Sequence, residues 1–500
     1  MTAVSTSIPS PVGGWNARDP LDSMPPQDAI VLENWFPESS KVSVRKGYIS
    51  HATGVGSGNV ETVMVYLGTT SKLLAASATN IYDATSAGAA SSLVSGKNNG
   101  RYQSVNFGGF LVMVNGADTP MTFNGSAIAN TTYTHASLSP ATIKSVASYK
   151  GRLYFAANQS AKFFYLPTGS VTGGALSDFD LSQVTERGGT LTAIGSWSRD
   201  GGDGLAAVIV FVMSSGEIVV YSGDDPSSAT NFQKVGSFFA AEPIGDRPLV
   251  NLGGDLIVIT KQGFIPVSLL LRGGTPQDVD ASNIGKVRQA AVDQAIATSD
   301  VFGWSGITDP GDNKLIVNVP TGGTTYEQYV WNITTGAWCK FTNIPALHFA
   351  RLNGELYFGG ASGVVYQISG TTDAGAAVPV KAKQAFNYFG DRASRKRITG
   401  VRPVIQLDGT QDFRIALDSD FGDRTLTATT HTITGLSEGG SWDTASWDLA
   451  DWAGAPTPNT TFLGTHSVGR NFALRVETFA SGQNISWLAS DFLGEKGGTI

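Results

Sequence analysis

Short apolar stretches separated by turns that contain Gly, Asn or Ser recur along the chain at intervals of roughly 40–60 residues. Each is rich in β-branched and aromatic residues and is followed, after a few polar residues, by a second such stretch. That pattern predicts a β-hairpin. Seven hairpins are visible, at 71–82, 109–123, 151–165, 206–221, 254–267, 314–331 and 354–367. Their spacing suits one four-stranded blade each, so the pattern predicts an all-β fold built on a β-propeller.

The number of blades depends on the last two hairpins. They lie close together in the sequence, so they either share one blade or form two. We favour six blades over seven.

A different periodicity appears at residues 282–296, which read SNIGKVRQAAVDQAI. Apolar Val287, Ala291 and Ile296 recur at partly helical spacing, and Ser282 suits a helix N-cap. We therefore expect a helical excursion between blades, at about residues 273–300. It either fills a gap between blades or contributes to an interface.

The composition changes after Gly370. Residues 371–379 are small and polar and read as a linker. Strands and turns alternate beyond it, with predicted strands at 401–407, 412–417, 424–434 and 472–479. This pattern predicts a separate β-sandwich-like domain over residues 376–500.

The first 50 residues carry aromatic residues among turn residues, and 42–48 alternates like an edge strand. A strand from this segment that completes the last blade would close the ring and remove a free sheet edge. We therefore expect an N-terminal segment at 1–50, a propeller at 51–375 and the C-terminal β-domain at 376–500.

Charge and cysteine content narrow the classes of function. The 34 Lys and Arg against 41 Asp and Glu give a net charge of −7, so bulk charge does not favour binding to nucleic acid. The single cysteine and the five scattered histidines offer no zinc-like spacing, and we expect no metal or cofactor. The start of the chain lacks the apolar core of a signal peptide, which favours a protein made and kept soluble in a cytoplasm.

Candidate catalytic motifs are better explained as turns. Gly96-Lys97-Asn98 fails as a phosphate loop, and Gly54, Gly56 and Gly58 read as a plain turn. The Gly-x-Ser-x-Gly match at 435–439 lacks the following helix that a nucleophile elbow needs. Adjacent Asp224 and Asp225 precede Pro226, as in a turn. Glu242 suits a buried acid, but a glycosidase needs two carboxylates. We assign no catalytic residue and expect a protein that is not an enzyme.

Two other clusters stand out. Arg392, Arg395, Lys396 and Arg397 form the densest basic stretch, which suits either a solvated loop or a contact with a partner. A nucleic-acid patch ranks third, because only three aromatic residues lie near for stacking. The second cluster comprises Trp442, Trp447 and Trp452, which could stack on sugar rings but more often pack in a core or an interface.

The opening segment at 13–48, GGWNARDPLDSMPPQDAIVLENWFPESSKVSVRKGY, resembles the start of tail nozzle and head–tail (packaged-DNA) stabilisation proteins of short-tailed bacteriophages, the tail tubular protein B-like family. That family has an Asn-Trp-Phe-Pro-like phrase, here residues 34–37, followed by a strand that ends in Arg-x-Gly-Tyr, here residues 45–48. The stretches at 219–232, 242–268 and 397–403 are similar to its middle and its C-terminal domain.

The resemblance implies a structural subunit of the virion, made in the host bacterium. It implies a ring of copies, a homo-hexamer, below the portal and adaptor and beside tail fibres or spikes. The ring's channel would retain phage DNA and conduct it during ejection, without sequence-specific binding. A weakly charged, acidic surface suits that task because it adheres poorly to phosphates.

Two rival interpretations remain. The first is a carbohydrate-binding or glycoside-cleaving propeller, such as a tail-associated glycosidase, which a pair of carboxylates at the propeller centre would favour. The second is a scaffold for protein partners unrelated to phage, whose blades usually carry a stricter repeat.

Overall fold

The structure is a computed structural model that describes residues 3–200, 205–423, 430–435 and 458–497. Its contacts divide the chain into two compact units. The propeller unit comprises residues 50–327 and 345–368. The terminal unit comprises residues 1–49, 328–344 and 369–500, so both ends of the chain belong to it. Almost all regular structure is β-strand, as the sequence predicts.

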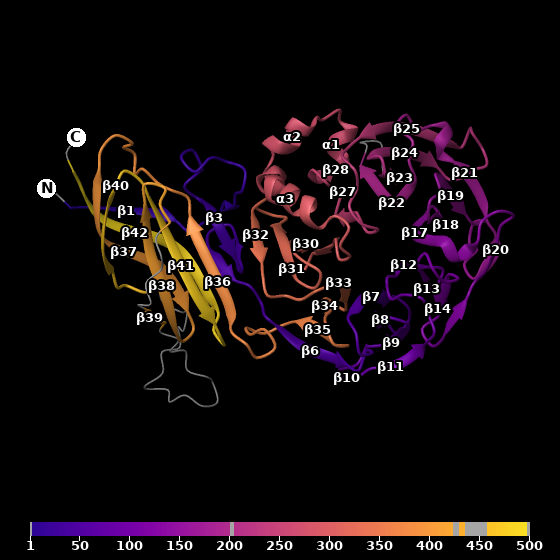
Figure 1. Cartoon of the computed structure of the whole chain (residues 1–500), viewed down its shortest axis with the longest axis horizontal. Helices are drawn as coiled ribbons and strands as arrows, with labels where there is room; N and C mark the ends of the chain where they lie inside the picture. Colours follow the sequence, from indigo (N-terminus) through magenta and orange to yellow (C-terminus); the bar gives the residue numbers. More distant parts are fainter. Residues whose placement is uncertain (1–2, 201–204, 424–429, 436–457, 498–500) are drawn as a thin grey trace. The chain divides into compact units, whose positions relative to one another are not determined.

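The propeller unit is a β-propeller, whose antiparallel strand groups follow one another around a ring (Figure 1). Blade 1 is β7 (Val60–Tyr66), β8 (Lys72–Ser77), β9 (Asn80–Asp83) and β11 (Ser91–Val94). Blade 2 is β12 (Gln103–Phe107), β13 (Phe110–Val114), β14 (Met121–Phe123) and β15 (Ile128–Asn130). Blade 3 is β17 (Ile143–Tyr149), β18 (Arg152–Ala157), β19 (Lys162–Tyr165) and β21 (Ser177–Asp180).

The ring continues with longer strands. Blade 4 is β22 (Leu191–Asp200), β23 (Leu205–Met213), β24 (Glu217–Gly223) and β25 (Phe232–Phe239). Blade 5 is β26 (Leu249–Leu252), β27 (Asp255–Thr260) and β28 (Gly263–Pro266). Blade 6 begins with β29 (Ser305–Asp309) and β30 (Lys314–Pro320). Blade 7 is β33 (His348–Leu352), β34 (Glu355–Gly359), β35 (Val365–Ile368) and β6 (Tyr48–Thr53), with β10 (Gly88–Ala89) on β6.

The seven predicted hairpins are confirmed, but within the described residues they give seven blades rather than six. The hairpins at 314–331 and 354–367, which the sequence allowed to share a blade, lie in different sheets. Local turn chemistry explains why hairpins were predictable. In the β33–β34 hairpin, Asn353 and Gly354 have φ of 51° and 91°, the left-handed pair that a two-residue turn of this hand requires.

Neighbouring blades pack through their faces. Between blades 3 and 4, Phe163 stacks on Phe211 with centroids 4.5 Å apart, and within blade 4 Tyr221 stacks on Phe232 at 4.6 Å. These side chains belong to one buried cluster. Offset aromatic pairs add about 0.5–1.5 kcal/mol each beyond the burial of their area, so such contacts hold the blades in a fixed order.

The predicted helical excursion is confirmed between blades 5 and 6, with more turns than the sequence indicated. It contains α1 (Val267–Leu271), α2 (Pro276–Ala281), the 3-10 helix η3 (Asn283–Val287) and α3 (Arg288–Thr298). Ser282 is the N-cap residue of η3, as expected, although its hydroxyl donates to the Val279 carbonyl instead of capping. Thr275 and Asp278 form a capping box that starts α2.

Four further elements connect strands within the ring. In the short parallel pair, β16 (Thr132–Thr134) lies between blades 2 and 3 in the sequence, and β20 (Gly173–Ala175) lies between β19 and β21 of blade 3. Two 3-10 helices, η1 (Pro140–Thr142) and η2 (Leu181–Gln183), precede β17 and follow β21.

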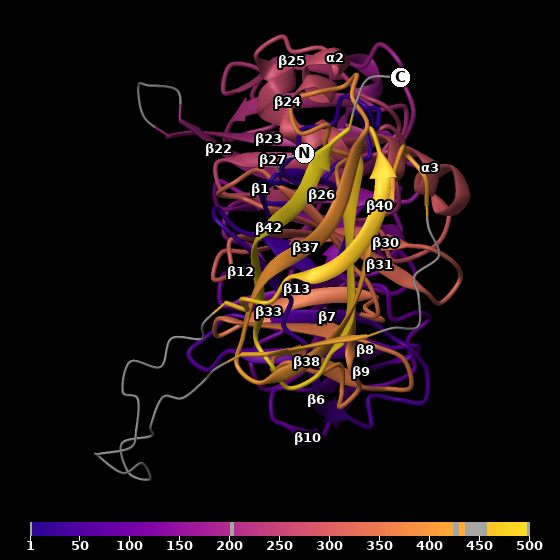
Figure 2. The same ribbon diagram turned by 90° about the vertical axis from the view of Figure 1, so that its left-hand side faces the viewer.

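The terminal unit is a β-sandwich whose first sheet Figure 2 shows in front. This sheet has the order β4 (Trp35–Pro37), β5 (Val42–Val44), β42 (Ile485–Lys496), β37 (Lys396–Leu407) and β40 (Leu463–Gly469), with β1 (Ala3–Pro9) on β42. The second sheet has the order β31 (Tyr326–Asn332), β32 (Trp338–Phe341), β3 (Asp28–Glu33), β36 (Val378–Gln384), β41 (Phe472–Ala480), β38 (Thr410–Ser419) and β39 (His431–Thr434), with β2 (Gly14–Trp15) on β3. Phe389 contacts Phe472 of the second sheet and Phe492 of the first.

The domain boundaries differ from the expected 1–50, 51–375 and 376–500. Residues 1–49 join the C-terminal strands, because β1 pairs along β42 from Ala3–Glu495 to Pro9–Ala489. A strand from the start of the chain does complete the last blade, but it is β6. The alternating segment at 42–48 instead supplies β5, which pairs with β4 and β42.

Candidate functional site

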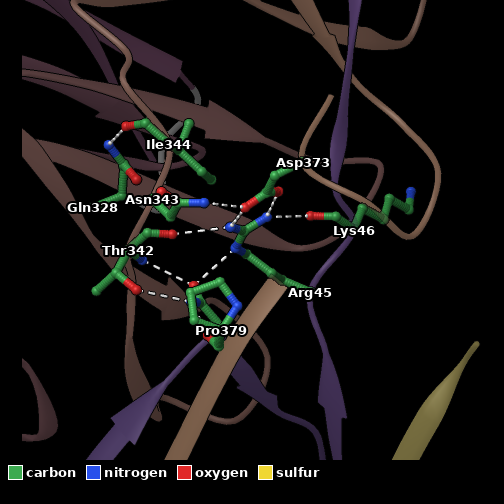
Figure 3. Close-up of polar contacts among 9 residues, drawn as sticks. Arg45, Lys46, Gln328, Thr342, Asn343, Ile344, Asp373 and Pro379 are labelled. Carbon is green, nitrogen blue, oxygen red and sulfur yellow. Dashed lines mark hydrogen bonds and ion pairs between the residues drawn. The ribbon is translucent and has the colours of Figure 1, made fainter. Parts of the chain in front are cut away.

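The segments at 34–37 and 45–48 contribute to a buried polar cluster in the terminal unit (Figure 3). Its centre is the ion pair between Arg45 and Asp373, whose side chains are 1% and 0% exposed. Nη1 and Nη2 of Arg45 donate to the two carboxylate oxygens of Asp373 at 2.8 and 2.7 Å. This two-pronged arrangement is the strongest geometry available to an Arg–carboxylate pair.

The remaining donors of Arg45 are also used. Nε donates to Oδ1 of Asn34 at 2.8 Å, Nη1 to the Lys46 carbonyl at 2.9 Å and Nη2 to the Thr342 carbonyl at 2.9 Å. A guanidinium has five N–H donors, and each therefore has an acceptor. Complete pairing of this kind offsets the cost of burying a charge.

Asn34 connects the cluster to the neighbouring strands. It adopts φ of 61°, a conformation that Asn tolerates better than most residues, between the ends of β3 and β4. Its Oδ1 also accepts from the Thr342 backbone, and its Nδ2 donates to Thr342 Oγ1 and the Pro379 carbonyl. The cluster thus joins segments 34–46, 342–344 and 373–379, and Gln328 supports it by donating to the Ile344 carbonyl.

Gly47 and Tyr48 continue the same joint. The Gly47 amide donates to the Gly370 carbonyl and the Tyr48 amide to the Thr372 carbonyl, at 2.8 and 3.0 Å. A methyl group on Gly47 would overlap the Thr372 backbone, so glycine is required for this close approach. Residues 371–379 are therefore not the linker that their small, polar composition indicated, because Asp373 is buried and β36 starts at Val378.

A second candidate is the central hollow of the propeller, a cavity of about 420 Å³. We use this name for the space lined by the first strand of every blade, together with residues 246–248. Those strands supply Thr62, Ser104, Ser148, Ser196, Asn251, Ser305 and His348. The lining is largely uncharged and hydroxylated.

The segment before β26 reaches into this hollow and crosses to blades 1 and 2. Arg247 Nη2 donates to Thr62 Oγ1 and to the Tyr102 carbonyl, both at 2.7 Å, and the guanidinium lies 5.1 Å from the Phe302 ring centroid. Gln103 donates to the Asp246 carbonyl. Burial lowers the pKa of Arg247 to about 10, so it remains a cation at neutral pH.

His348 occupies the same hollow on β33. Its Nδ1 donates to the Val63 carbonyl at 3.0 Å, and burial, with the nearby charge of Arg247, holds the pKa of His348 well below its usual value. The imidazole is therefore neutral at pH 7. Asp246 is the one carboxylate among the described lining residues, and its Oδ1 lies 3.6 Å from Lys144 Nζ.

The acids singled out in the sequence do not converge. Asp225 accepts from the backbone and hydroxyl of Ser227 at 3.2 and 2.8 Å, which is the predicted turn between β24 and β25. Glu242 is not buried: its side chain is 55% exposed and pairs with Lys261. A buried acid not singled out in the sequence is Glu217, on β24, whose carboxylate accepts from the Glu186 and Arg187 amides.

The basic stretch separates into different roles. Arg392 is exposed, pairs with Asp22 at 2.8 Å and lies 4.5 Å over the Tyr388 ring. Lys396 is buried and donates to the Asp391, Ser394 and Arg470 carbonyls. Arg395 and Arg397 are exposed. Lys396 thus holds a loop in place, which its neighbourhood in the sequence did not indicate.

Other predicted features are turns or lie outside the described residues. Asn98 bonds to Asp118 in a loop contact. Trp442, Trp447, Trp452 and Ser437 lie outside the described residues. The described residues contain no group of His, Cys, Asp and Glu arranged to hold a metal, and no helix among them is long and apolar enough to cross a membrane.

Sequence analysis missed Asp373, Arg247 and Glu217. Asp373 lies 328 positions from Arg45 and stands in a stretch of small residues, so nothing local marked it. A usable signal for Glu217 was its place at the start of an apolar strand, where an unpaired carboxylate is costly.

Comparison with known proteins adds little. No family model and no curated protein matches the chain. Among solved structures, the extracellular domain of a hybrid two-component system from B. thetaiotaomicron has 11% identity and a TM-score of 0.37, over 78% of this chain and 47% of that chain. The chain thus spans about half the length of that protein.

Two further structures have similar scores. BBS1N, solved in complex with ARL6DN, has 12% identity and a TM-score of 0.41, over 66% of this chain and 100% of that chain. A chain of the Mitotic Checkpoint Complex has 9% identity and a TM-score of 0.38, over 65% of this chain and 92% of that chain. The assignment of a β-propeller rests on the strand pairing and on the seven first strands around one hollow.

Proposed function

We propose that this chain is a structural virion protein, a nozzle or hub subunit of a short bacteriophage tail. Copies of it form a closed ring, a homo-hexamer, below the portal and adaptor. The ring retains phage DNA and conducts it during ejection. The subunit is a scaffold and not an enzyme.

The observation that carries this proposal is the role of the family-like motif. Asn34, Arg45 and Gly47 stand at the places that resemble the nozzle family, and each has a specific structural task in the buried cluster with Asp373. Trp35 and Tyr48 of the same motif are buried as well. A motif whose members lock distant segments together suits a load-bearing subunit rather than a catalytic one.

The size of the central hollow favours a DNA channel formed between copies over one that runs through a single chain. At about 420 Å³, with Arg247 reaching across it, the hollow cannot admit a duplex whose major groove alone is about 12 Å wide. A ring of copies forms when a head-to-tail interface closes by rotation. A net charge of −7 per copy weakens adhesion of phosphates to such a ring.

The glycosidase rival gains no support from the hollow. Hydrolysis needs two carboxylates about 5–9.5 Å apart around the scissile bond. Among the described residues that line the hollow, Asp246 is the one acid, and it faces Lys144.

Light scattering and negative-stain electron microscopy of the purified full chain, alone and mixed with the adaptor of the same phage, test the proposal. We expect closed rings in at least one of the two samples. A monomer in both would overturn the proposal. Gold-labelled antibody against the chain should also bind at the tail of virions.

Incubation of the chain with host surface polysaccharides tests for glycosidase activity. We expect no release of reducing ends by the wild-type chain or by Asp225→Ala. Hydrolysis by the wild type that Asp225→Ala abolishes would replace the nozzle proposal with the glycosidase rival.

A further inference from the structure

A cavity of about 590 Å³ opens at the rim of blades 4 and 5, next to α1, α2 and α3. We call it the rim pocket. Its walls come from the β23–β24 turn, from residues 239–242 after β25, from the β27–β28 turn and from the helices. All of these segments belong to the propeller unit. The size is within the range of sites that bind small molecules or peptide side chains.

The charge of the rim pocket opposes that of the whole chain. Its lining contains three cations, Arg187, Lys261 and Arg288, and one carboxylate, Glu242. The chain as a whole carries −7. A concave surface lined by one sign of charge concentrates ligands of the other sign.

Arg187 has a fixed backbone, but its guanidinium is not in an ion pair with any described residue. The amides of Glu186 and Arg187 donate to the buried carboxylate of Glu217 at 2.9 and 2.8 Å, which fixes the backbone at this point. The guanidinium lies 4.4 Å over the ring of Phe239, whose side chain is 39% exposed. The structure gives Arg187 no carboxylate partner among the described residues. The guanidinium is therefore positioned by the fixed backbone and the ring contact rather than by an ion pair.

The loop that carries Arg187 is also fixed on both sides. Ser215 Oγ donates to the Gly188 carbonyl at 2.8 Å, and Lys234 Nζ donates to the Val184 carbonyl at 2.7 Å. A cation on a fixed loop loses little entropy when it meets a ligand.

The other two cations lie across the pocket. Lys261 pairs with Glu242 at 2.5 Å, and both side chains are about half exposed. Arg288, at the start of α3, donates to the Gln262 carbonyl at 3.2 Å and lies 3.4 Å from Asp280. Exposed pairs of this kind contribute little to stability and exchange readily for an incoming carboxylate.

Apolar side chains complete the lining. Ile265, Leu270 and Val279, from β28, α1 and α2, line the pocket and are nearly buried. A ligand that covers the small part of this apolar surface that is still exposed gains about 25 cal/mol per Å². The rim pocket thus combines cationic side chains that attract anions with apolar side chains.

We propose that the rim pocket binds an acidic peptide segment of another protein, with carboxylates at Arg187 and Lys261 and an apolar side chain against Leu270. A nucleotide fits less well, because Arg187 already covers one face of Phe239, the aromatic ring in the described lining on which a base would stack. The inference goes beyond the proposed nozzle function and does not depend on it.

Fluorescence anisotropy tests this site with a labelled peptide that carries Glu and Leu in a Gly/Ser background, and with the same peptide carrying Gln for Glu. The full chain should bind the Glu peptide more tightly, and the difference should shrink as salt increases. Arg187→Gln should weaken binding about tenfold, since it removes a charged hydrogen bond.

Arg392→Gln is the matched control, because Arg392 is also an exposed arginine over an aromatic ring but lies in the terminal unit. It should leave binding unchanged. Leu270→Ala should weaken binding of the Glu peptide and of the Gln peptide equally. Equal binding of the two peptides, an unaffected Arg187→Gln variant, or displacement by AMP at lower concentration than by unlabelled Glu peptide would each overturn the inference.

Discussion

Replacing Arg45 by Met tests how much the buried cluster of the terminal unit contributes. The change keeps most of the side-chain volume but removes all five N–H donors. Asp373, with a side chain that is 0% exposed, would retain only the Asn343 amide at 2.9 Å among the described partners of its carboxylate. A buried charge that loses its partner costs about 3–5 kcal/mol, and we expect the terminal unit to lose that much.

Two related variants separate the loss of hydrogen bonds from the cost of leaving Asp373 unpaired. Arg45→Lys keeps the charge but offers three donors in place of five, so it should cost about 1.5–3 kcal/mol. Asp373→Leu added to Arg45→Met removes the unpaired carboxylate and should recover part of the loss. Recovery would show that the stranded charge of Asp373 is the main cost of the single change.

Urea unfolding followed by tryptophan fluorescence measures these differences, because Trp35 and Trp487 are buried 6.0 Å apart in the same unit. Arg392→Met is the control. It breaks an ion pair whose side chains are 61% and 54% exposed, and it should cost at most about 1 kcal/mol. If Arg45→Met were no more destabilising than this control, the cluster would not be the structural joint described above.

Three further predictions concern the cores and two titrating groups. Phe211→Ala removes the ring stacked on Phe163 and should cost the propeller unit about 3–5 kcal/mol by calorimetry, against about 0.5 kcal/mol for the exposed Phe479. The folded-state pKa of His348 lies below the unfolded value, so the unfolded chain binds more protons, and the free energy of unfolding decreases as pH falls below about 6.5, by at most about 1.4 kcal/mol per pH unit. His348→Gln should reduce that slope in urea unfolding, and an unchanged slope would contradict the lowered pKa of His348. Lys496, Ser394 and nearby amides lower the pKa of Asp391, a contribution that is fully present above about pH 4 and shrinks as pH falls from there toward the lowered pKa. Asp391→Asn should therefore destabilise the terminal unit less at pH 2.5 than at pH 7, and equal loss at both would refute this.

Local structure was predictable because its causes are local. A hairpin needs two apolar strands and a turn residue that tolerates positive φ, and Asn353-Gly354 supplies both positions of such a turn. The helical excursion was visible for the same reason, since Ser282 and the apolar spacing after it lie within one stretch of sequence.

Pairing between distant segments was not predictable from these patterns. The strand at 42–48 alternates as an edge strand does, but nothing in it indicates whether its partner is the last blade or β42. Two hairpins close together in sequence likewise leave open whether one sheet or two will hold them. These choices follow from packing over the whole chain, which local periodicity does not encode.

The candidate site was only partly predictable. The resemblance drew attention to Asn34 and Arg45 but not to their partner, because Asp373 lies in a stretch whose small residues resemble a linker. Glu242 suited a buried acid in the sequence, although its side chain is 55% exposed. Burial of a charge depends on which segments converge around it.

The strand β35, which pairs with β6, is synthesised much later than β6, and this has a consequence for folding on the ribosome. About 310 residues separate Thr53 from Val365, the start of the strand beside it in blade 7. At about 5–20 residues per second, roughly 15–60 s pass between emergence of the two strands. For that time β6 presents unpaired amides and carbonyls, so nascent chains are most exposed to mispairing before translation passes residue 368.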